Sequence, residues 1–265
     1  MPPNLNRTRV LLVTALPLLA AGTTLFFVLH SGHGTGRTPA RSAVARSARK
    51  EPRVSQPHIL TNAKTAYWAV VLRRVRVFAR PSASARVVTT LPTMTGDGTQ
   101  NIVLVLSELV VAPHHVWYRV RLAILPNGSI AWVPRSALGK LYSVGTHLYI
   151  NLATRRATLR RNGIAVFTAS IGIGLANSPT PRGQFYIRDK LNGFHNPFYG
   201  PVAFGTSARS AVLTDWPGGG YIGVHGTDQP RTLPGRVSHG CVRLRNAAIV
   251  ALARLMPVGT PVTIT

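Results

Sequence analysis

The chain has 265 residues, of which 45% are hydrophobic, and it carries 31 Lys and Arg against only 6 Asp and Glu. This length and apolar content can fill the cores of two modest domains, and the net charge of +25 favours contact with polyanions or an anionic membrane surface. The arginines are scattered, without zinc-finger spacing or an aromatic-interleaved basic stripe, so no nucleic-acid partner is expected. A single cysteine excludes an internal disulfide.

The N-terminus is apolar. Val10 to Leu29 contains no charged residue and follows Arg7 and Arg9, and twenty such residues can span a bilayer as a helix. Residues 1–30 are therefore predicted to be a membrane anchor or signal segment, with an uncleaved anchor preferred. The basic residues between positions 37 and 50 outnumber those before the apolar run, and by themselves would keep the following part in the cytoplasm.

Residues 31–65 are rich in Ser, Gly, Arg, Ala and Pro and show little periodicity, which predicts a flexible linker. As a random coil, a segment of this length would reach roughly 30–35 Å.

Residues 66–139 show short apolar alternations interrupted by Pro, Gly and Asn, which predicts a small β-barrel. The expected strands are 70–72, 75–78, 87–91, 102–106, 116–122 and 130–133. The stretches 80–82, 117–120 and 128–133 resemble a bacterial SH3-like domain, which by analogy would bind a cell-wall polymer. Trp117 and Trp132 could line a ligand groove or fill the barrel core.

Residues 143–265 combine strands with one helix. Strands are expected at 148–152, 157–159 and 164–170, with Asn162-Gly163 as a tight hairpin turn, and Gly172 and Gly174 are expected to open a loop that leads to 180–187. One helix is expected between Leu244 and Pro257, with Asn246 as its cap. This would place Cys241 just before a helix start, where backbone amides favour a thiolate.

Cys241 lies in Ser238-His239-Gly240-Cys241-Val242-Arg243, sixteen positions after His225-Gly226. A thiol next to an imidazole is the usual nucleophile–base pair, whereas a core cysteine would have aliphatic neighbours. From residue 140 onward there are only three Asp and no Glu. These are few carboxylates for a two-carboxylate glycosidase or a carboxylate-rich metal site, so neither is favoured. Thiol-based acyl chemistry remains, with His225 and His239 as the candidate bases.

These motifs resemble the L,D-transpeptidase catalytic domain, the YkuD-type family, together with Thr180-Pro-Arg-Gly-Gln-Phe185 and the tail from Val258 to Ile264. The resemblance implies a mainly β fold: a small SH3-like β-barrel followed by a β-sandwich catalytic domain with few short helices. It makes Cys241 the nucleophile, His225 the base and Gly226 the residue whose carbonyl holds the imidazole. The acidic residue that often follows the family's Asn is missing after Asn246.

The remaining site residues have expected roles that follow from the same resemblance. The amides of Gly240 and Cys241, with His239 nearby, are candidates for the oxyanion hole. Arg243 could clamp a substrate carboxylate or form a bracing ion pair, and Ser238 is expected in substrate binding or as a turn residue.

The reaction implied by the resemblance is cleavage of the L–D peptide bond of a peptidoglycan peptide stem and transfer of the acyl group to an amine of another stem. No metal or organic cofactor is expected, and β-lactams of the carbapenem type would acylate Cys241. The alternatives are a thiol-dependent carboxypeptidase of the same stems and a non-catalytic wall-binding protein. Because this substrate lies outside the cytoplasm, the expected location is the cell envelope, with the N-terminal segment in the membrane.

Overall fold

The computed structural model describes residues 56–113, 115–192, 196–213 and 220–265, and residues 52–265 form one compact unit. The predicted anchor (1–30) and most of the predicted linker (31–65) lie outside the described residues. In the part that is described, no helix is long and apolar enough to cross a membrane.

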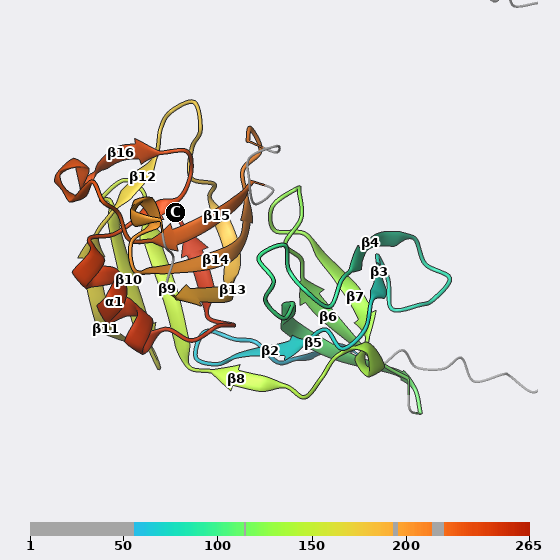
Figure 1. Ribbon diagram of the computed structural model, residues 1–265. Helices are drawn as coiled ribbons and strands as arrows, with labels where there is room; N and C mark the ends of the chain where they lie inside the picture. Colours follow the sequence, from blue (N-terminus) through green and yellow to red (C-terminus); the bar gives the residue numbers. More distant parts are fainter. Residues whose placement is uncertain (1–55, 114, 193–195, 214–219) are drawn as a thin grey trace, which may run out of the picture. The chain divides into compact units, whose positions relative to one another are not determined.

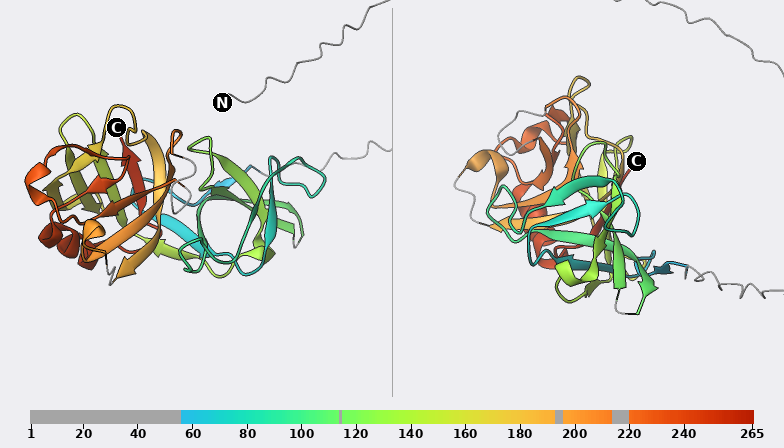
Figure 2. Two further views of the ribbon diagram at one scale, coloured as in Figure 1. Left: turned by 45° about the horizontal axis from the view of Figure 1, so that its top comes forward. Right: turned by 90° about the vertical axis from the view of Figure 1, so that its right-hand side faces the viewer.

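The first sheet has eight strands in the order β4-β3-β7-β6-β5-β2-β8, with β1 paired to β5, and it curls around its own core (Figure 2). Its strands are β1 His58–Ile59, β2 Ala66–Val70, β3 Val75–Phe78, β4 Val87–Leu91, β5 Ile102–Ala112, β6 His115–Arg121, β7 Ile130–Pro134 and β8 Tyr142–Val144. The predicted strands 75–78 and 87–91 have those bounds, whereas the strand expected at 70–72 ends at Val70.

Alternation explains these strands. Side chains of period two point inward, so that Val120 and Val133 are fully buried while their neighbours remain partly accessible, whereas Ile102–Val105 of β5 is buried without interruption. Trp117 is also a core residue, because it is only 9% exposed and its ring meets Phe78 edge-on at 5.7 Å. The assignment of this sheet to an SH3-like domain remains a prediction.

The second sheet has ten strands in the order β11-β10-β9-β18-β13-β14-β15-β17-β12-β16 (Figure 1). They are β9 Thr146–Asn151, β10 Arg156–Arg161, β11 Ile164–Ser170, β12 Gly172–Gly174, β13 Gly183–Asn192, β14 Val202–Arg209, β15 Tyr221–His225, β16 Gly235–Ser238, β17 Val242–Arg243 and β18 Pro261–Ile264. Within the described residues, four short helices accompany the two sheets: η1 Arg135–Ala137, η2 Pro197–Tyr199, η3 Pro230–Thr232 and α1 Asn246–Leu255. The mainly β fold class is therefore confirmed.

The predicted hairpin turn is present between β10 and β11. Asn162 and Gly163 both have positive φ, 52° and 85°, which is the combination that a tight turn between right-twisted strands requires. Gly172–Gly174, expected in a loop, instead forms β12, which pairs with β16 and β17. Its glycines hid this strand from a pattern based on apolar side chains.

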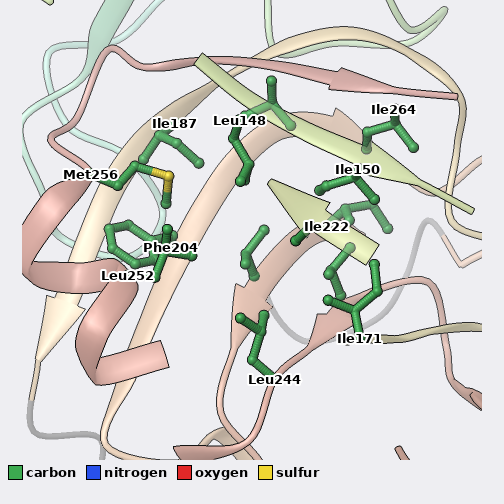
Figure 3. Packing of buried hydrophobic residues seen from close by; sticks show 14 of the residues in the cluster. Leu148, Ile150, Ile171, Ile187, Phe204, Ile222, Leu244, Leu252, Met256 and Ile264 are labelled. Atoms are coloured by element: carbon green, nitrogen blue, oxygen red, sulfur yellow. The ribbon is translucent and has the colours of Figure 1, made fainter. Parts of the chain in front are cut away.

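The core of the second sheet lies beneath α1 (Figure 3). Ile249 and Leu252 of the helix are fully buried and belong to the same cluster as Phe204 of β14 and Ile222 of β15. Burying each such side chain stabilises the fold by about 1.5–3 kcal/mol. This packing holds the central strands in place, and those strands carry the residues described next.

The expected cap of α1 is not there. The residue preceding the helix is Arg245, without a side-chain cap, and Asn246 is already the first helical residue. Cys241 lies five positions earlier, directly before β17, so that it is not at a helix N-terminus. A short parallel strand, which the sequence pattern did not reveal, separates the two.

The two sheets also meet in a small cluster in which Tyr186 of β13 packs with Ala66, Ile102 and Leu104. The Tyr186 hydroxyl donates to the Ile102 carbonyl at 3.1 Å, and Arg121 donates to the Gln184 carbonyl at 2.9 Å. Strand β13 is therefore supported from both sheets.

Candidate active site

Cys241 follows a tight turn formed by residues 238–240. Gly240 has φ 117°, and a Cβ at this position would press against Ile222 Cδ1 at 2.8 Å, so only glycine fits. The buried Ser238 hydroxyl donates to the Cys241 carbonyl at 2.6 Å and accepts from the Gly240 amide at 3.2 Å. The Thr180 hydroxyl donates to the Gly240 carbonyl at 2.8 Å. The thiol is thus carried on a fixed backbone.

The Cys241 thiol is half-buried, and its Sγ accepts a hydrogen bond of 3.3 Å from the Gly223 amide. Burial raises the pKa of this thiol, while the Gly223 amide and the positive charge of Arg243 act in the opposite direction. The expectation that a helix terminus lowers this pKa was therefore wrong, because α1 begins farther along the chain. The resting sulfur is a neutral thiol that needs a base.

His225 ends β15 and is only 1% exposed. Its Nδ1 lies 2.6 Å from the Gly226 carbonyl, and because a carbonyl can only accept, Nδ1 carries the proton. The Nε2 atom is buried and has no hydrogen-bond partner among the described residues. Burial, assisted by the charge of Arg243, lowers the pKa of His225 to about 4, so the imidazole is neutral at pH 7 with a lone pair on Nε2.

The thiol and the imidazole border one small space. A Cβ built on Gly223 would lie 3.6 Å from His225 Cδ2 and 3.7 Å from Cys241 Sγ. The side chains also line the same cavity of about 290 Å³. The structure thus brings together the two residues that the sequence motif paired.

Two aromatic rings enclose the imidazole. Tyr199 meets His225 edge-on at 5.0 Å, and Phe198 lies 6.1 Å from it. Both belong to η2, whose first turn is fixed because the Asn196 side chain accepts from the Phe198 amide at 3.0 Å. Nothing in the sequence pattern pointed to these rings, because their segment has no periodicity.

Asn246 supports the turn that follows His225. Its Oδ1 accepts from the Thr227 amide at 2.9 Å, and a side chain at Gly226 would collide with it. The residue expected to cap α1 therefore reaches from the helix to the loop whose carbonyl orients the imidazole. This packing also explains the glycine at position 226.

The other predicted residues occupy different places around the cavity. His239 is exposed and lines the cavity, whereas Arg243 is only 4% exposed and holds its guanidinium 4.3 Å from the Phe198 ring centre. The Gly240 amide already donates to Ser238. Ser238 also borders the cavity, but its hydroxyl is occupied by the turn.

The arrangement suits proton transfer from a thiol to a neutral imidazole next to a cavity, which is the chemistry of cysteine acyl transfer. Among the described residues, no group of three His, Cys, Asp or Glu could hold a metal ion. The fold and this site define a mainly β protein with a cysteine–histidine pair in a groove.

Comparison with known proteins gives the family. The family model described as the YkuD L,D-transpeptidase catalytic domain matches residues 145–264. YkuD of Bacillus subtilis (strain 168) is 30% identical over 123 residues, which cover 46% of this chain and 68% of that protein. YkuD of Bacillus licheniformis is 31% identical over 116 residues, covering 44% and 63%. The chain belongs to the YkuD L,D-transpeptidase catalytic domain family.

A solved L,D-transpeptidase of Mycobacterium tuberculosis H37Rv is 15% identical, with a TM-score of 0.41, and the alignment covers 74% of this chain and 96% of that one.

Proposed function

We propose that this protein is a peptidoglycan L,D-transpeptidase that works through an acyl-enzyme on Cys241. The observation that carries the proposal is the buried, unpartnered Nε2 of a neutral His225 next to the thiol. A neutral imidazole nitrogen without a hydrogen-bond donor can accept a proton, and the neighbouring thiol can supply one.

In the first step, His225 Nε2 takes the thiol proton while Sγ attacks the carbonyl carbon of the L–D peptide bond in a tetrapeptide stem. The carbonyl oxygen becomes an oxyanion. Because the Gly240 amide is engaged by Ser238, the Cys241 amide is the backbone donor proposed for this oxyanion. Collapse of the tetrahedral intermediate breaks the C–N bond, and the imidazolium protonates the leaving D-alanine.

In the second step, an amine of another stem attacks the thioester carbon and the sulfur leaves. The neutral state of His225 fits both steps, since it must accept a proton and return it at each. Arg243, whose charge is held near the cavity by stacking on Phe198, is proposed to attract the free carboxylates of the stem.

The surroundings of this reaction are part of the proposal. The site would work in the cell envelope, outside the cytoplasm, with the N-terminal segment in the membrane and the first sheet contacting a wall polymer. The apolar run before residue 30 supports the membrane segment, and the net charge of +25 supports contact with an anionic polymer.

A carbapenem and isolated peptide stems test the proposal. Intact-mass measurement is expected to show one covalent adduct on the wild-type protein, none on Cys241→Ala and slow formation on His225→Gln. Incubation with tetrapeptide stems is expected to give cross-linked dimers and released D-alanine. An adduct on Cys241→Ala would overturn the assignment of the nucleophile, and shortened monomers without dimers would make the protein a carboxypeptidase.

A further inference from the structure

The cavity next to Cys241 has an acidic end, although the protein as a whole is strongly basic. The chain has only six Asp and Glu against 31 Lys and Arg, yet Asp97 and Asp189 both line this cavity. Asp97 is exposed in the turn between β4 and β5, and Asp189 lies on β13. Two of the six acids thus border a single cavity of about 290 Å³.

Asp189 is a buried carboxylate with one oxygen unused. The residue is only 3% exposed, and its Oδ1 accepts from the Gly205 amide at 2.8 Å. The other oxygen, Oδ2, is buried and has no hydrogen-bond partner among the described residues. Leaving a buried acceptor without a hydrogen bond costs free energy, and the cost is larger for a charged group. A ligand that donates a hydrogen bond to this oxygen would therefore be bound favourably.

The neighbouring arginine does not supply that donor. The Arg188 guanidinium lies over the ring of Tyr221, 4.2 Å from its centre, so that its charge acts on Asp189 only through space. Burial raises the pKa of Asp189 and the charge of Asp97 adds to this, whereas the charge of Arg188 and the Gly205 amide lower it, as a bound cation would.

Two glycines connect this carboxylate to the thiol. Asp189 of β13 pairs with Gly205 of β14, and Gly205 pairs with Gly223 of β15, whose amide contacts Cys241 Sγ. These three strands run side by side (Figure 1). Since adjacent strands are about 4.8 Å apart, Asp189 lies roughly 10 Å from the backbone of Gly223.

This glycine row, Gly205 and Gly223, leaves room above the sheet for the Asp189 carboxylate at Gly205 and for the approach to the thiol at Gly223. A Cβ at Gly205 would collide with the Asp189 carboxylate, and a Cβ at Gly223 would touch both His225 and Cys241. Both glycines line the cavity together with the carboxylate and the thiol. The row therefore forms the floor of a trough with an anion at one end and the nucleophile at the other.

We propose that Asp189, assisted by Asp97, binds the primary ammonium of the acceptor amine before that amine attacks the acyl-enzyme. This inference rests on the proposed function and adds to it the residues that recruit the acceptor. A primary ammonium presents three N–H donors and one positive charge, which suits an unpaired carboxylate oxygen in a narrow space. The long, unbranched stem of a diamino acid would lie along the glycine floor.

The chemistry of the second step balances with this arrangement. The bound ammonium loses one proton to solvent, and the neutral amine attacks the thioester carbon as the C–S bond breaks. A second proton passes from the nitrogen through His225 to the departing sulfur, which restores the thiol. The carboxylates take no part in bond making; they concentrate and orient the amine.

Two nucleophiles of different charge test the proposal on a preformed acyl-enzyme. Nα-acetyl-lysine amide carries a primary ammonium, whereas hydroxylamine is uncharged at neutral pH. In Asp189→Asn, which keeps an oxygen for the Gly205 amide, kcat/KM for the lysine derivative is expected to fall about tenfold, mainly through KM, because the charge that binds the ammonium is gone. For Asp97→Asn, whose carboxylate is exposed, about threefold is expected.

Glu108→Gln is the matched control, since it removes one negative charge on β5 from a residue that does not line the cavity. This control should leave the preference between the two nucleophiles as in the wild type. Reaction with hydroxylamine should change by less than about twofold in either aspartate variant, because an uncharged nucleophile gains nothing from a carboxylate. Equal losses with both nucleophiles would show that Asp189 serves only the fold.

The proposal is also overturned if both aspartate variants keep the wild-type preference for the lysine derivative. If Asp189→Asn does not fold, Asp97→Asn alone decides, because it changes an exposed turn. Failure of the wild-type protein to form any acyl-enzyme would instead contradict the proposed function, so that the two failures are distinguishable.

Discussion

The backbone amide of Gly223 donates a hydrogen bond to Cys241 Sγ at 3.3 Å, from a strand that does not carry the cysteine. This contact holds the sulfur atom next to the backbone of β15. It also lowers the pKa of the thiol, which would stabilise the thiolate of the proposed mechanism. The absence of a side chain at residue 223 is what lets a substrate approach the same sulfur.

Gly223→Ala should fold and lose activity. The new methyl would sit 3.4–3.7 Å from Phe204 O, His225 Cδ2 and Cys241 Sγ, which is ordinary contact distance. It would nevertheless occupy the approach to the sulfur, and crowding of about 1–3 kcal/mol in the transition state corresponds to roughly 5–150-fold in rate. Stopped-flow acylation by a carbapenem measures this loss.

Gly139→Ala is the control for that substitution. Its methyl would also meet only ordinary contacts, with Leu72 and Val70. Gly139 is far from Cys241 in the sequence, and its neighbours belong to the first sheet or lie next to it. Both variants should keep their unfolding free energy within about 1 kcal/mol of the wild type. A fast Gly223→Ala variant would show that substrate reaches Cys241 by another path.

Asn246→Ala should remove the hydrogen bond that connects α1 to the turn containing Gly226 and Thr227. It removes the acceptor of the Thr227 amide, a hydrogen bond of 2.9 Å, and leaves that donor unsatisfied, which costs about 1–3 kcal/mol of stability. Because the Gly226 carbonyl then moves, the imidazole loses its fixed orientation and the acylation rate should fall more than stability alone explains.

Asn62→Ala provides the comparison, since Asn62 also accepts backbone amides, those of Lys64 and Thr65, in an exposed turn outside the second sheet. Chemical denaturation and acylation kinetics are measured on both variants. An Asn246→Ala protein with wild-type acylation would refute the role given to this side chain.

Acylation should lose rate only in strong acid. The pKa of His225 is lowered to about 4 by burial, so that the base stays unprotonated as pH falls until about that value. The rate of adduct formation, followed by mass spectrometry from about pH 3.5 to 8, is therefore expected to show its acidic limb near pH 4. A limb near pH 6.5 would mean that the imidazole is solvated like an ordinary histidine.

The same shift makes stability depend on pH in a defined direction. Between about pH 6.5 and 4 the unfolded chain binds a proton at residue 225 and the folded protein does not, so the unfolding free energy falls as pH falls. The contribution from this group is at most about 3 kcal/mol and is complete near pH 4. Denaturation of wild type and His225→Gln across this range should show a smaller slope in the variant, which keeps His147, another histidine whose pKa burial lowers.

The sequence pattern predicted strands with alternating apolar residues, such as Val75–Phe78, and it paired Cys241 with His225, which line the same cavity. It did not reveal β12 or β17, because glycine-rich or very short strands are stabilised by pairing rather than by a face of apolar side chains. Asn246 was read as a cap because local spacing favours that role, whereas its partner lies nineteen residues away in the sequence.

The acidic end of the cavity was also beyond reach of the sequence. Asp97 and Asp189 are separated by more than ninety positions, and only the placement of a turn from the first sheet brings both to one cavity. The positions of Phe198 and Tyr199 next to His225 could not be predicted either, because an irregular segment has no periodicity from which a contact with the imidazole could be inferred.

The floor of the trough is made of backbone at Gly205 and Gly223, and this limits how the site can diverge. A residue with a side chain at either position can only shorten or close the trough. Substitution there is therefore expected to reduce activity and not to create a preference for another substrate. Changes in substrate choice must come from the walls, where Phe198, Tyr199, Leu213 and His239 line the cavity. An engineer who wishes to redirect this enzyme should vary the walls and leave the floor as glycine.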